Sequence, residues 1–246
     1  MRVVVLGSTG YHPNEIRHTS CLMIPELGIV LDAGTGMFRV RDRLVTEELL
    51  IFLSHAHLDH VFGLTFLFDV LHQRPTKRVI VYAEATKLAA IQEHLLHELL
   101  FPVKLPCEYR PLTGDVDLPG GGRLNHFPVD HPGASVGFRL EWPGHSLAYV
   151  TDTSADPAAD YVERLGGVDL LIHECNFDDS LREHAILTGH STTTPVAQVA
   201  RAAGVRRLIL THLNSISNAV DPVGLEVARA IFPQTWLATD GLELEF

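Results

Sequence analysis

The chain has 246 residues, of which 46% are hydrophobic, which is enough apolar material for one large α/β domain with a sizeable core. Its formal net charge of −11 disfavours long nucleic acid as a partner, because a polyanion is repelled unless the basic residues gather on one face. The three cysteines are widely spaced and form no C-x-x-C pair, so they indicate neither a disulfide framework nor a thiolate zinc site.

The chain begins with a predicted strand, the β-branched and apolar residues 2–6. This apolar start is too short for a signal peptide before Gly7, and no apolar run approaches the roughly 20 residues that span a bilayer. We therefore expect a cytoplasmic protein with no membrane partner. Residues 20–24 and 27–31 flank Pro25-Glu26 and predict a hairpin.

The next polar residue after this hairpin is Asp32, at the end of a predicted strand. It has two interpretations: it supports a metal-bound histidine from behind, or it is a turn aspartate.

The central motif is Ser54-His55-Ala56-His57-Leu58-Asp59-His60, which directly follows the apolar strand predicted over residues 49–53. Alternate residues of an extended segment point the same way, so His55 and His57 can bind one metal ion. Asp59 and His60 lie at the start of a predicted helix over residues 60–72 and are expected to point elsewhere. One short loop can thus supply ligands to two metal ions.

The remaining elements alternate between short apolar strands and helical patterns. Further strands are predicted at 78–82, 123–129, 135–140, 146–150, 168–172, 207–210, 235–238 and 242–246, and helices at 84–100, 195–203 and 221–231. Residues 102–117 predict a loop with one short strand. His94 and His97 are three apart on a helix and could share a metal, but the glutamates beside them favour a solvated face.

Three further candidate ligands each follow a separate predicted strand: His131, Asp152 and His212. Because strand ends at one edge of a sheet converge in space, these residues are expected to meet the central motif. Seven ligands fit two tetrahedral ions if Asp152 is shared. The predicted sets are His55, His57 and His131 for one ion, and Asp59, His60 and His212 for the other.

The order H-x-H-x-D-H, then a distant His, Asp and His, resembles the metallo-β-lactamase fold superfamily over nearly the whole chain, from Ser20-Cys21 to Asp240-Gly241. The resemblance implies an α/β (α+β) fold, a four-layer αβ/βα sandwich of two mixed sheets between helix layers, in a single domain 1–246. Within the superfamily, four segments are similar to ribonuclease Z and related phosphodiesterases. They are Phe62-Gly63-Leu64, His173-Glu174, Gly189-His190-Ser191-Thr192 and Ala238-Thr239-Asp240-Gly241.

By this resemblance His190 lies near the scissile phosphate, and the Glu174 carboxylate orients it. Without the resemblance, His190 has a second interpretation, as a polar residue that helps to start a helix. The expected cofactors are two divalent metal ions, with Zn²⁺ favoured and Mn²⁺ or Fe also compatible with such ligands. The expected mechanism uses a metal-bridging hydroxide as nucleophile, with Asp59 orienting it and His190 assisting at the phosphoryl or leaving oxygen.

This sequence departs from the ribonuclease Z pattern in ways that concern the substrate. Leu58 replaces a usual glycine, and Asn214-Ser215-Ile216-Ser217 stands where an Arg-Tyr pair is usual. The 20 residues between His131 and Asp152 leave no room for a long tRNA-gripping arm. We therefore expect a hydrolase for a small anionic phosphodiester, such as a cyclic nucleotide, a cyclic sugar phosphate or a short oligonucleotide.

Alternative functions fit the same ligands. They are a thioester or lactone hydrolase of this fold, and a ribonuclease Z-type endonuclease without the arm. An iron redox protein is disfavoured by the intact Asp59, His60 and His212, which indicate two metal ions. A metal-binding module without turnover is disfavoured by the full ligand set together with Glu174 and His190. A homodimer is compatible with an arm-free enzyme of this kind.

Overall fold

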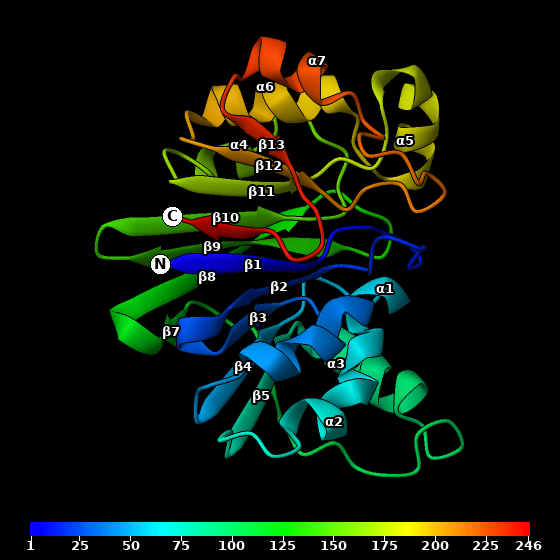
Figure 1. Ribbon diagram of the computed structural model, residues 1–246, viewed down its shortest axis with the longest axis vertical. Coiled ribbons are helices and arrows are strands. Elements are labelled where there is room, and N and C mark those ends of the chain that lie inside the picture. Colours follow the sequence, from blue (N-terminus) through cyan, green and yellow to red (C-terminus); the bar gives the residue numbers. More distant parts are fainter. The chain divides into compact units, whose positions relative to one another are not determined.

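The computed structural model describes residues 1–246 and divides the chain into two compact units, each built on one seven-stranded sheet (Figure 1). The first unit comprises residues 1–13, 17–114 and 240–245. The second comprises residues 14–16, 115–239 and 246.

The sheet of the first unit has the strand order β14-β1-β2-β3-β4-β5-β6. Its strands are β1 (Arg2–Gly7), β2 (Cys21–Ile24), β3 (Ile29–Leu31), β4 (Glu48–Phe52), β5 (Arg78–Ala83), β6 (Glu108–Pro111) and β14 (Glu243–Glu245). The pairs from β14 to β3 are antiparallel and those from β3 to β6 are parallel. The carboxyl ends of β3 and β4 therefore lie at the same edge, directly before Asp32 and the central motif.

Three short helices lie on one side of this sheet (Figure 1). They are α1 (Leu58–Val61), α2 (Leu67–Leu71) and α3 (Ala85–Ala90), and 3-10 turns span Pro25–Leu27, Thr35–Arg43 and Phe62–Phe66. Alternate residues of β4 and β5, such as Ile51 and Val81, form a buried core with helix residues such as Leu67 and Leu88.

The helix predicted over residues 60–72 is broken into three pieces, α1, a 3-10 turn and α2. At the break, Gly63 packs so closely on the Gly34 backbone that a Cβ atom there would lie 2.2 Å from the Gly34 carbonyl oxygen. A single straight helix over these residues is therefore wrong. Only glycine, which has no side chain, allows this contact, and through it the segment after the central motif packs directly on residues 33–34.

The sheet of the second unit has the order β13-β12-β11-β10-β9-β8-β7. Its strands are β7 (Val116–Leu118), β8 (Gly122–Val129), β9 (Ser135–Trp142), β10 (His145–Val150), β11 (Leu170–Glu174), β12 (Leu208–Thr211) and β13 (Thr235–Leu237). Strands β10 to β13 are parallel, and β9 is antiparallel to both β8 and β10. Strands β8 and β10 to β13 therefore end at one edge, where ligands bind in α/β sheets.

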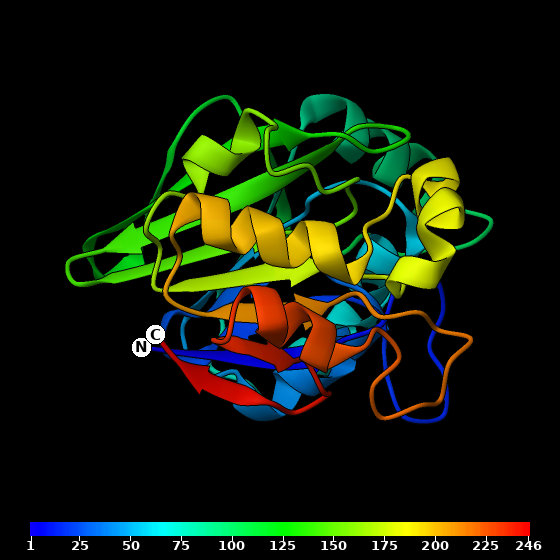
Figure 2. The ribbon, with the colours of Figure 1, turned by 90° about the horizontal axis from the view of Figure 1, so that it is seen from above.

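Helices of the second unit cover the face of its sheet next to β11 and β12 (Figures 1 and 2). They are α4 (Tyr161–Arg164), α6 (Thr193–Ala203) and α7 (Leu225–Ile231). Helix α5 (Arg182–Thr188) lies beyond the ends of the strands, and 3-10 turns occur at Pro119–Gly121 and Asp179–Leu181. The apolar side of α6, with Val196 and Val199, is buried in one core cluster with Leu171 and Leu208 of the strands.

Most predicted strands are present within one or two residues of their expected bounds, and the differences have local causes. Residues 102–117 contain one whole strand and the start of another rather than one short strand. The helix predicted over 84–100 is α3 followed by a π-helical turn that ends at Leu95. The helix predicted from Asp221 begins at Leu225, because the Asp221 carboxylate accepts hydrogen bonds from the backbone N–H groups of three following residues and closes a turn. None of the helices combines the length and the apolar composition that spanning a bilayer requires.

Candidate metal centre

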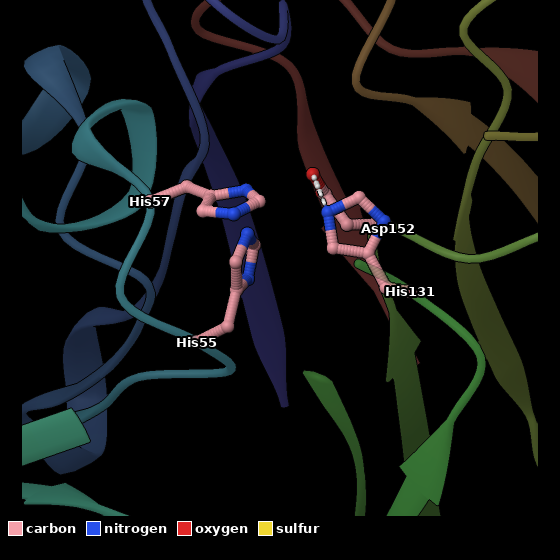
Figure 3. A group of neighbouring side chains, drawn as sticks. All are labelled: His55, His57, His131 and Asp152. Atoms are coloured by element: carbon pink, nitrogen blue, oxygen red, sulfur yellow. Dashed lines mark ion pairs between the residues drawn. The ribbon is translucent and has the colours of Figure 1, made fainter. Parts of the chain in front are cut away.

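The central motif is positioned by β4, which ends at Phe52 and leads into an extended segment before α1 begins at Leu58. The imidazole rings of His55 and His57 lie 4.5 Å apart at 78° (Figure 3), and those of His55 and His60 lie 4.2 Å apart. The first unit thus gathers three histidines of the predicted ligand set around one point.

Asp59 extends this group. Its Oδ2 atom lies 3.3 Å from Nε2 of His60 and accepts a hydrogen bond of 2.7 Å from the Tyr11 backbone N–H. The contact with Tyr11 could not be read from the sequence, since it joins a backbone group to a residue 48 positions away. It holds one carboxylate oxygen beside the His60 ring.

Asp32 lies behind the motif with its side chain fully buried. Its carboxylate accepts hydrogen bonds from the Ser54 backbone N–H at 2.8 Å and from the Ser54 hydroxyl at 2.9 Å. The same carboxylate lies 2.8 Å from Nδ1 of His60, and because a carboxylate accepts, Nδ1 carries the proton. The nitrogen suited to bind an ion is then Nε2. Asp32 therefore contacts the His60 ring from behind, as one of its two interpretations requires, and metal binding by His60 stays a prediction.

The second unit brings its predicted ligands together at the edge where its parallel strands end. His131 follows β8, Asp152 follows β10 and His212 follows β12. The Asp152 carboxylate lies between two imidazoles: Oδ2 is 3.6 Å from Nε2 of His131 (Figure 3), and Oδ1 is 3.1 Å from Nε2 of His212. A carboxylate flanked in this way suits the shared ligand that the sequence predicts.

The Nδ1 atoms of His131 and His212, on the far side of each ring from Asp152, contact other protein groups. Nδ1 of His131 donates to the Gly189 carbonyl oxygen at 2.9 Å. The Asn176 amide lies 3.2 Å from Nδ1 of His212 and donates to the His212 carbonyl oxygen at 2.9 Å. Burial lowers the pKa of His131, which favours the neutral imidazole that a metal ion requires. Sequence reasoning missed Asn176, whose only signal is its place two residues after Glu174.

The backbone at the site adopts a conformation that is uncommon for residues with a side chain. Asp32, Asp152 and His212 have φ angles of 57°, 41° and 54°. Such left-handed angles are rare outside glycine, and each occurs directly after a strand of the sheet or one residue later. The sharp change of direction aims each side chain away from its strand.

Glu174 and His190 form a second arrangement within the same unit. Nδ1 of His190 donates to Oε1 of Glu174 at 3.0 Å, and the Glu174 side chain is fully buried. Three backbone N–H groups also donate to this carboxylate, from Thr153 at 2.9 Å, Asn176 at 3.1 Å and Ser191 at 3.2 Å. The polar atoms of Glu174, His190 and His212 lie within 4.8 Å of one another. Because four donors occupy the Glu174 carboxylate, we assign it to anchoring His190 rather than to an ion.

His173, one residue beyond the predicted end of its strand, is part of β11, where it pairs with Leu210. Its Nδ1 donates to the Glu174 carbonyl oxygen at 2.8 Å, so its Nε2 accepts from the Tyr161 hydroxyl at 3.1 Å. Full burial lowers the pKa of His173. This histidine supports the backbone under Glu174.

The histidines of the helical region 84–100 take no part in the site. His94 and His97 are exposed, as expected for a solvated face. Between His131 and Asp152 the chain forms only the β9–β10 hairpin, so the expected absence of an arm at this point is confirmed.

Comparison with known proteins places this geometry in a family. A family model described as a β-lactamase superfamily domain matches residues 28–213. The ribonuclease Z of Synechococcus sp. (strain CC9902) is 48% identical over 313 positions, covering 100% of this chain and 98% of that protein. Since 313 positions exceed the 246 residues of this chain, the relative contains segments that this chain lacks.

Solved structures share the fold. The metallo-β-lactamase fold protein YhfI from Bacillus subtilis superposes with a TM-score of 0.80 at 21% identity, covering 99% of both chains. The short form of human tRNase Z superposes with a TM-score of 0.78 at 22% identity, covering 100% of this chain and 99% of that one. The fold class expected from the sequence, an α/β sandwich with two mixed sheets and helices, is confirmed.

Proposed function

From its membership of the β-lactamase superfamily and of the ribonuclease Z branch, which makes this chain a metal-dependent hydrolase, we propose a more specific function. The protein is a phosphodiesterase with a dinuclear metal centre. The observation that carries the proposal is the Asp152 carboxylate set between the Nε2 atoms of His131 and His212. It is the arrangement that a carboxylate shared by two ions needs.

In this proposal the two ligand groups act together, and the whole chain, 1–246, is one catalytic domain. The proposed sets are His55, His57, His131 and Asp152 for one ion, and Asp59, His60, Asp152 and His212 for the other. The donor chemistry fits: the Nδ1 atoms of His60 and His131 donate to protein oxygens, the pattern typical of metal-bound histidine.

Imidazole nitrogens with carboxylate oxygens favour Zn²⁺, and Mn²⁺ or Fe accept the same ligands. Such ions, when bound, supply Lewis acidity that acidifies water and offsets the charge of a phosphodiester.

The chain's own residues have separate roles in the proposed reaction. Asp59 would orient the attacking water, since its carboxylate is fixed by the Tyr11 backbone. His190 has its Nδ1 proton held by Glu174, so Nε2 is the nitrogen that would carry a proton to the leaving oxygen. General acid catalysis of this kind contributes about 10² to 10⁴ in rate.

The proposed substrate is a small anionic phosphodiester, such as a cyclic nucleotide or a short oligonucleotide. Three observations support this: the net charge of −11, the short β9–β10 connection, and the segments present in the ribonuclease Z relative but absent here. A cytoplasmic location and a homodimeric state belong to the same proposal.

A second candidate is favoured by one specific observation. The 48% identity to a protein named ribonuclease Z supports an endonuclease acting on RNA without the arm. A thioester or lactone hydrolase of the same fold is the remaining alternative.

A substrate panel tests these functions. The protein, loaded with zinc or manganese, would be assayed with bis(p-nitrophenyl) phosphate, 2′,3′-cyclic nucleotides, a precursor tRNA, a glutathione thioester and an acyl-homoserine lactone. We expect turnover of the small diesters, its loss with chelator and in His131→Ala, and no change in the surface variant His94→Ala. Turnover of the thioester or lactone without diester hydrolysis would refute the proposal, and cleavage of precursor tRNA in preference to the small diesters would establish the second candidate.

A further inference from the structure

The first unit contains a pocket of about 640 Å³ that the roles assigned above do not use. Sites for small organic ligands fall in the range of roughly 300–1,000 Å³. Residues that line it include His18, Thr35, Phe38, Arg41, Phe66 and Asp69. Most of its wall is apolar, with a few polar groups at defined places, as in pockets that bind a planar organic ring.

The pocket adjoins the proposed ligand Asp59 through two lining segments. Pro13, also in its wall, is two residues from Tyr11, whose backbone N–H donates to the Asp59 carboxylate. Thr35 follows Gly34, which packs so closely on Asp59 that a Cβ there would lie 2.2 Å from the Asp59 carbonyl oxygen. Residues 11–13 and 34–35 thus connect the pocket wall to Asp59 within the same unit, and we take the group linked to a phosphodiester at Asp59 to extend along them.

Aromatic rings form two sides of the pocket. Phe38 is 46% exposed, its ring lies 4.9 Å from that of His18 at 58°, and the Arg39 guanidinium lies 5.0 Å from its centroid, so one face of the ring is covered. Phe66 contacts Phe62 edge to face at 5.7 Å, which fixes its ring. The His18 ring is held by a contact of 3.2 Å between Nδ1 and the Thr35 hydroxyl. Burial lowers the pKa of His18, which favours an uncharged ring.

Arg41 and Asp69 both line the pocket and are neighbours there. The Arg41 guanidinium donates to the Asp69 backbone carbonyl, which places it next to the exposed Asp69 residue. Arginine pairs with the O6 and N7 acceptors of guanine, and a carboxylate accepts from base amino groups. A guanidinium and a carboxylate together match a base edge that has both kinds of group.

We propose that this pocket binds the nucleobase of the nucleoside attached to the scissile phosphodiester, with guanine satisfying both Arg41 and Asp69. The inference rests on the proposed phosphodiesterase function and narrows its substrates to nucleoside diesters. Stacking on Phe38 supplies affinity for any base, because every base has a π-face. Asp69 supplies the preference among bases.

Guanosine binding tests the pocket without any reaction, since guanosine has no phosphodiester. Isothermal titration calorimetry of the zinc-loaded chain would compare the wild type with Phe38→Ala and Asp69→Asn. We expect Phe38→Ala to weaken binding of both guanosine and adenosine at least tenfold, and Asp69→Asn to weaken guanosine alone. The matched control is Phe68→Ala, because Phe68 is also 46% exposed but does not line the pocket. Absence of guanosine binding, or equal effects of Phe38→Ala and Phe68→Ala, would overturn the inference.

Kinetics separate this inference from the proposed function. For guanosine 2′,3′-cyclic phosphate we expect Phe38→Ala to raise KM about tenfold with kcat retained, while turnover of methyl p-nitrophenyl phosphate, which has no nucleobase, is unchanged. Guanosine binding without any diester hydrolysis would refute the proposed phosphodiesterase function but support the nucleobase-binding role of the pocket. Diester hydrolysis without guanosine binding would support the function and refute the role of the pocket. A dimer that dissociates in Phe38→Ala, with no guanosine bound by the wild type, would assign the pocket to a second copy of the chain and overturn the inference.

Discussion

Asp32 and His60, 28 positions apart in sequence, form a fully buried pair in which a carboxylate oxygen lies 2.8 Å from the imidazole Nδ1. Two hydrogen bonds from Ser54 hold the same carboxylate in place. The pair fixes both the proton position and the orientation of the His60 ring, so a candidate ligand is oriented before any ion binds.

Removing the charge of Asp32 should weaken metal binding. In Asp32→Asn one carboxylate oxygen becomes an N–H₂ group, which donates hydrogen bonds. It must then face either the Ser54 N–H or the His60 Nδ1–H, which are also donors, so one of these hydrogen bonds is lost. We expect zinc affinity to fall about 10- to 100-fold, the usual effect of losing such a partner. Competition against a chromophoric chelator measures this. Asp42→Asn, at a side chain that is 78% exposed, is the matched control, and equal affinities in the two variants would contradict the assigned role.

His190 should affect turnover without affecting metal content. We expect His190→Ala to lower kcat for a small diester by about 10² to 10⁴, because the proton donor held by Glu174 is lost. Steady-state kinetics together with elemental analysis of the same sample separate the two effects. His184→Ala, an exposed histidine on α5, should leave both unchanged. Loss of metal along with turnover in His190→Ala would instead make His190 a ligand.

The contact between Gly63 and the Gly34 carbonyl oxygen should tolerate no side chain. A Cβ at Gly63 would lie 2.2 Å from that oxygen, so Gly63→Ala must shift the central motif. We expect destabilisation of about 1–3 kcal/mol, as for other overpacking substitutions. Thermal unfolding followed by circular dichroism measures it. Gly114→Ala is the control, because a Cβ there meets nothing within 4 Å. A wild-type Tm for Gly63→Ala would show that the break between α1 and α2 is not sterically required.

Buried His173 should make the stability of the protein depend on pH. Its folded-state pKa lies below the ordinary value of 6.5, so the unfolded chain binds a proton here at higher pH than the folded chain does. Stability from this residue is therefore full above about pH 6.5 and decreases as the pH falls toward the folded-state pKa, by up to about 1.4 kcal/mol per pH unit. Urea unfolding at pH 7.0 and 5.5 measures the slope. We expect a smaller slope for His173→Gln, and an unchanged slope would show that other groups cause the acid sensitivity.

The sequence was sufficient to predict which residues follow strands, because apolar or alternating segments of four to seven residues are clear and the polar residues after them are few. His131, Asp152 and His212 each follow the strand they were expected to follow. Their role as metal ligands stays a prediction, with the experiments above as its test.

The supporting contacts could not be predicted in the same way. The Gly189 carbonyl behind His131 and the Tyr11 N–H on Asp59 are backbone groups, and any residue type could supply them. Asn176 meets His212 across 36 positions through tertiary folding alone. The break between α1 and α2 likewise depends on the contact between Gly63 and Gly34, which the spacing of apolar residues does not predict.

The left-handed backbone of Asp32, Asp152 and His212 sets a limit on engineering this protein. Each such residue costs about 1–2 kcal/mol relative to a right-handed conformation, and glycine would largely avoid that penalty. A search for thermostable variants would thus be drawn to these three positions and would select against the side chains that we propose to bind or support the metal ions. Under that proposal stability and activity make opposite demands on the same residues, so stabilising changes should be sought away from the ends of these strands.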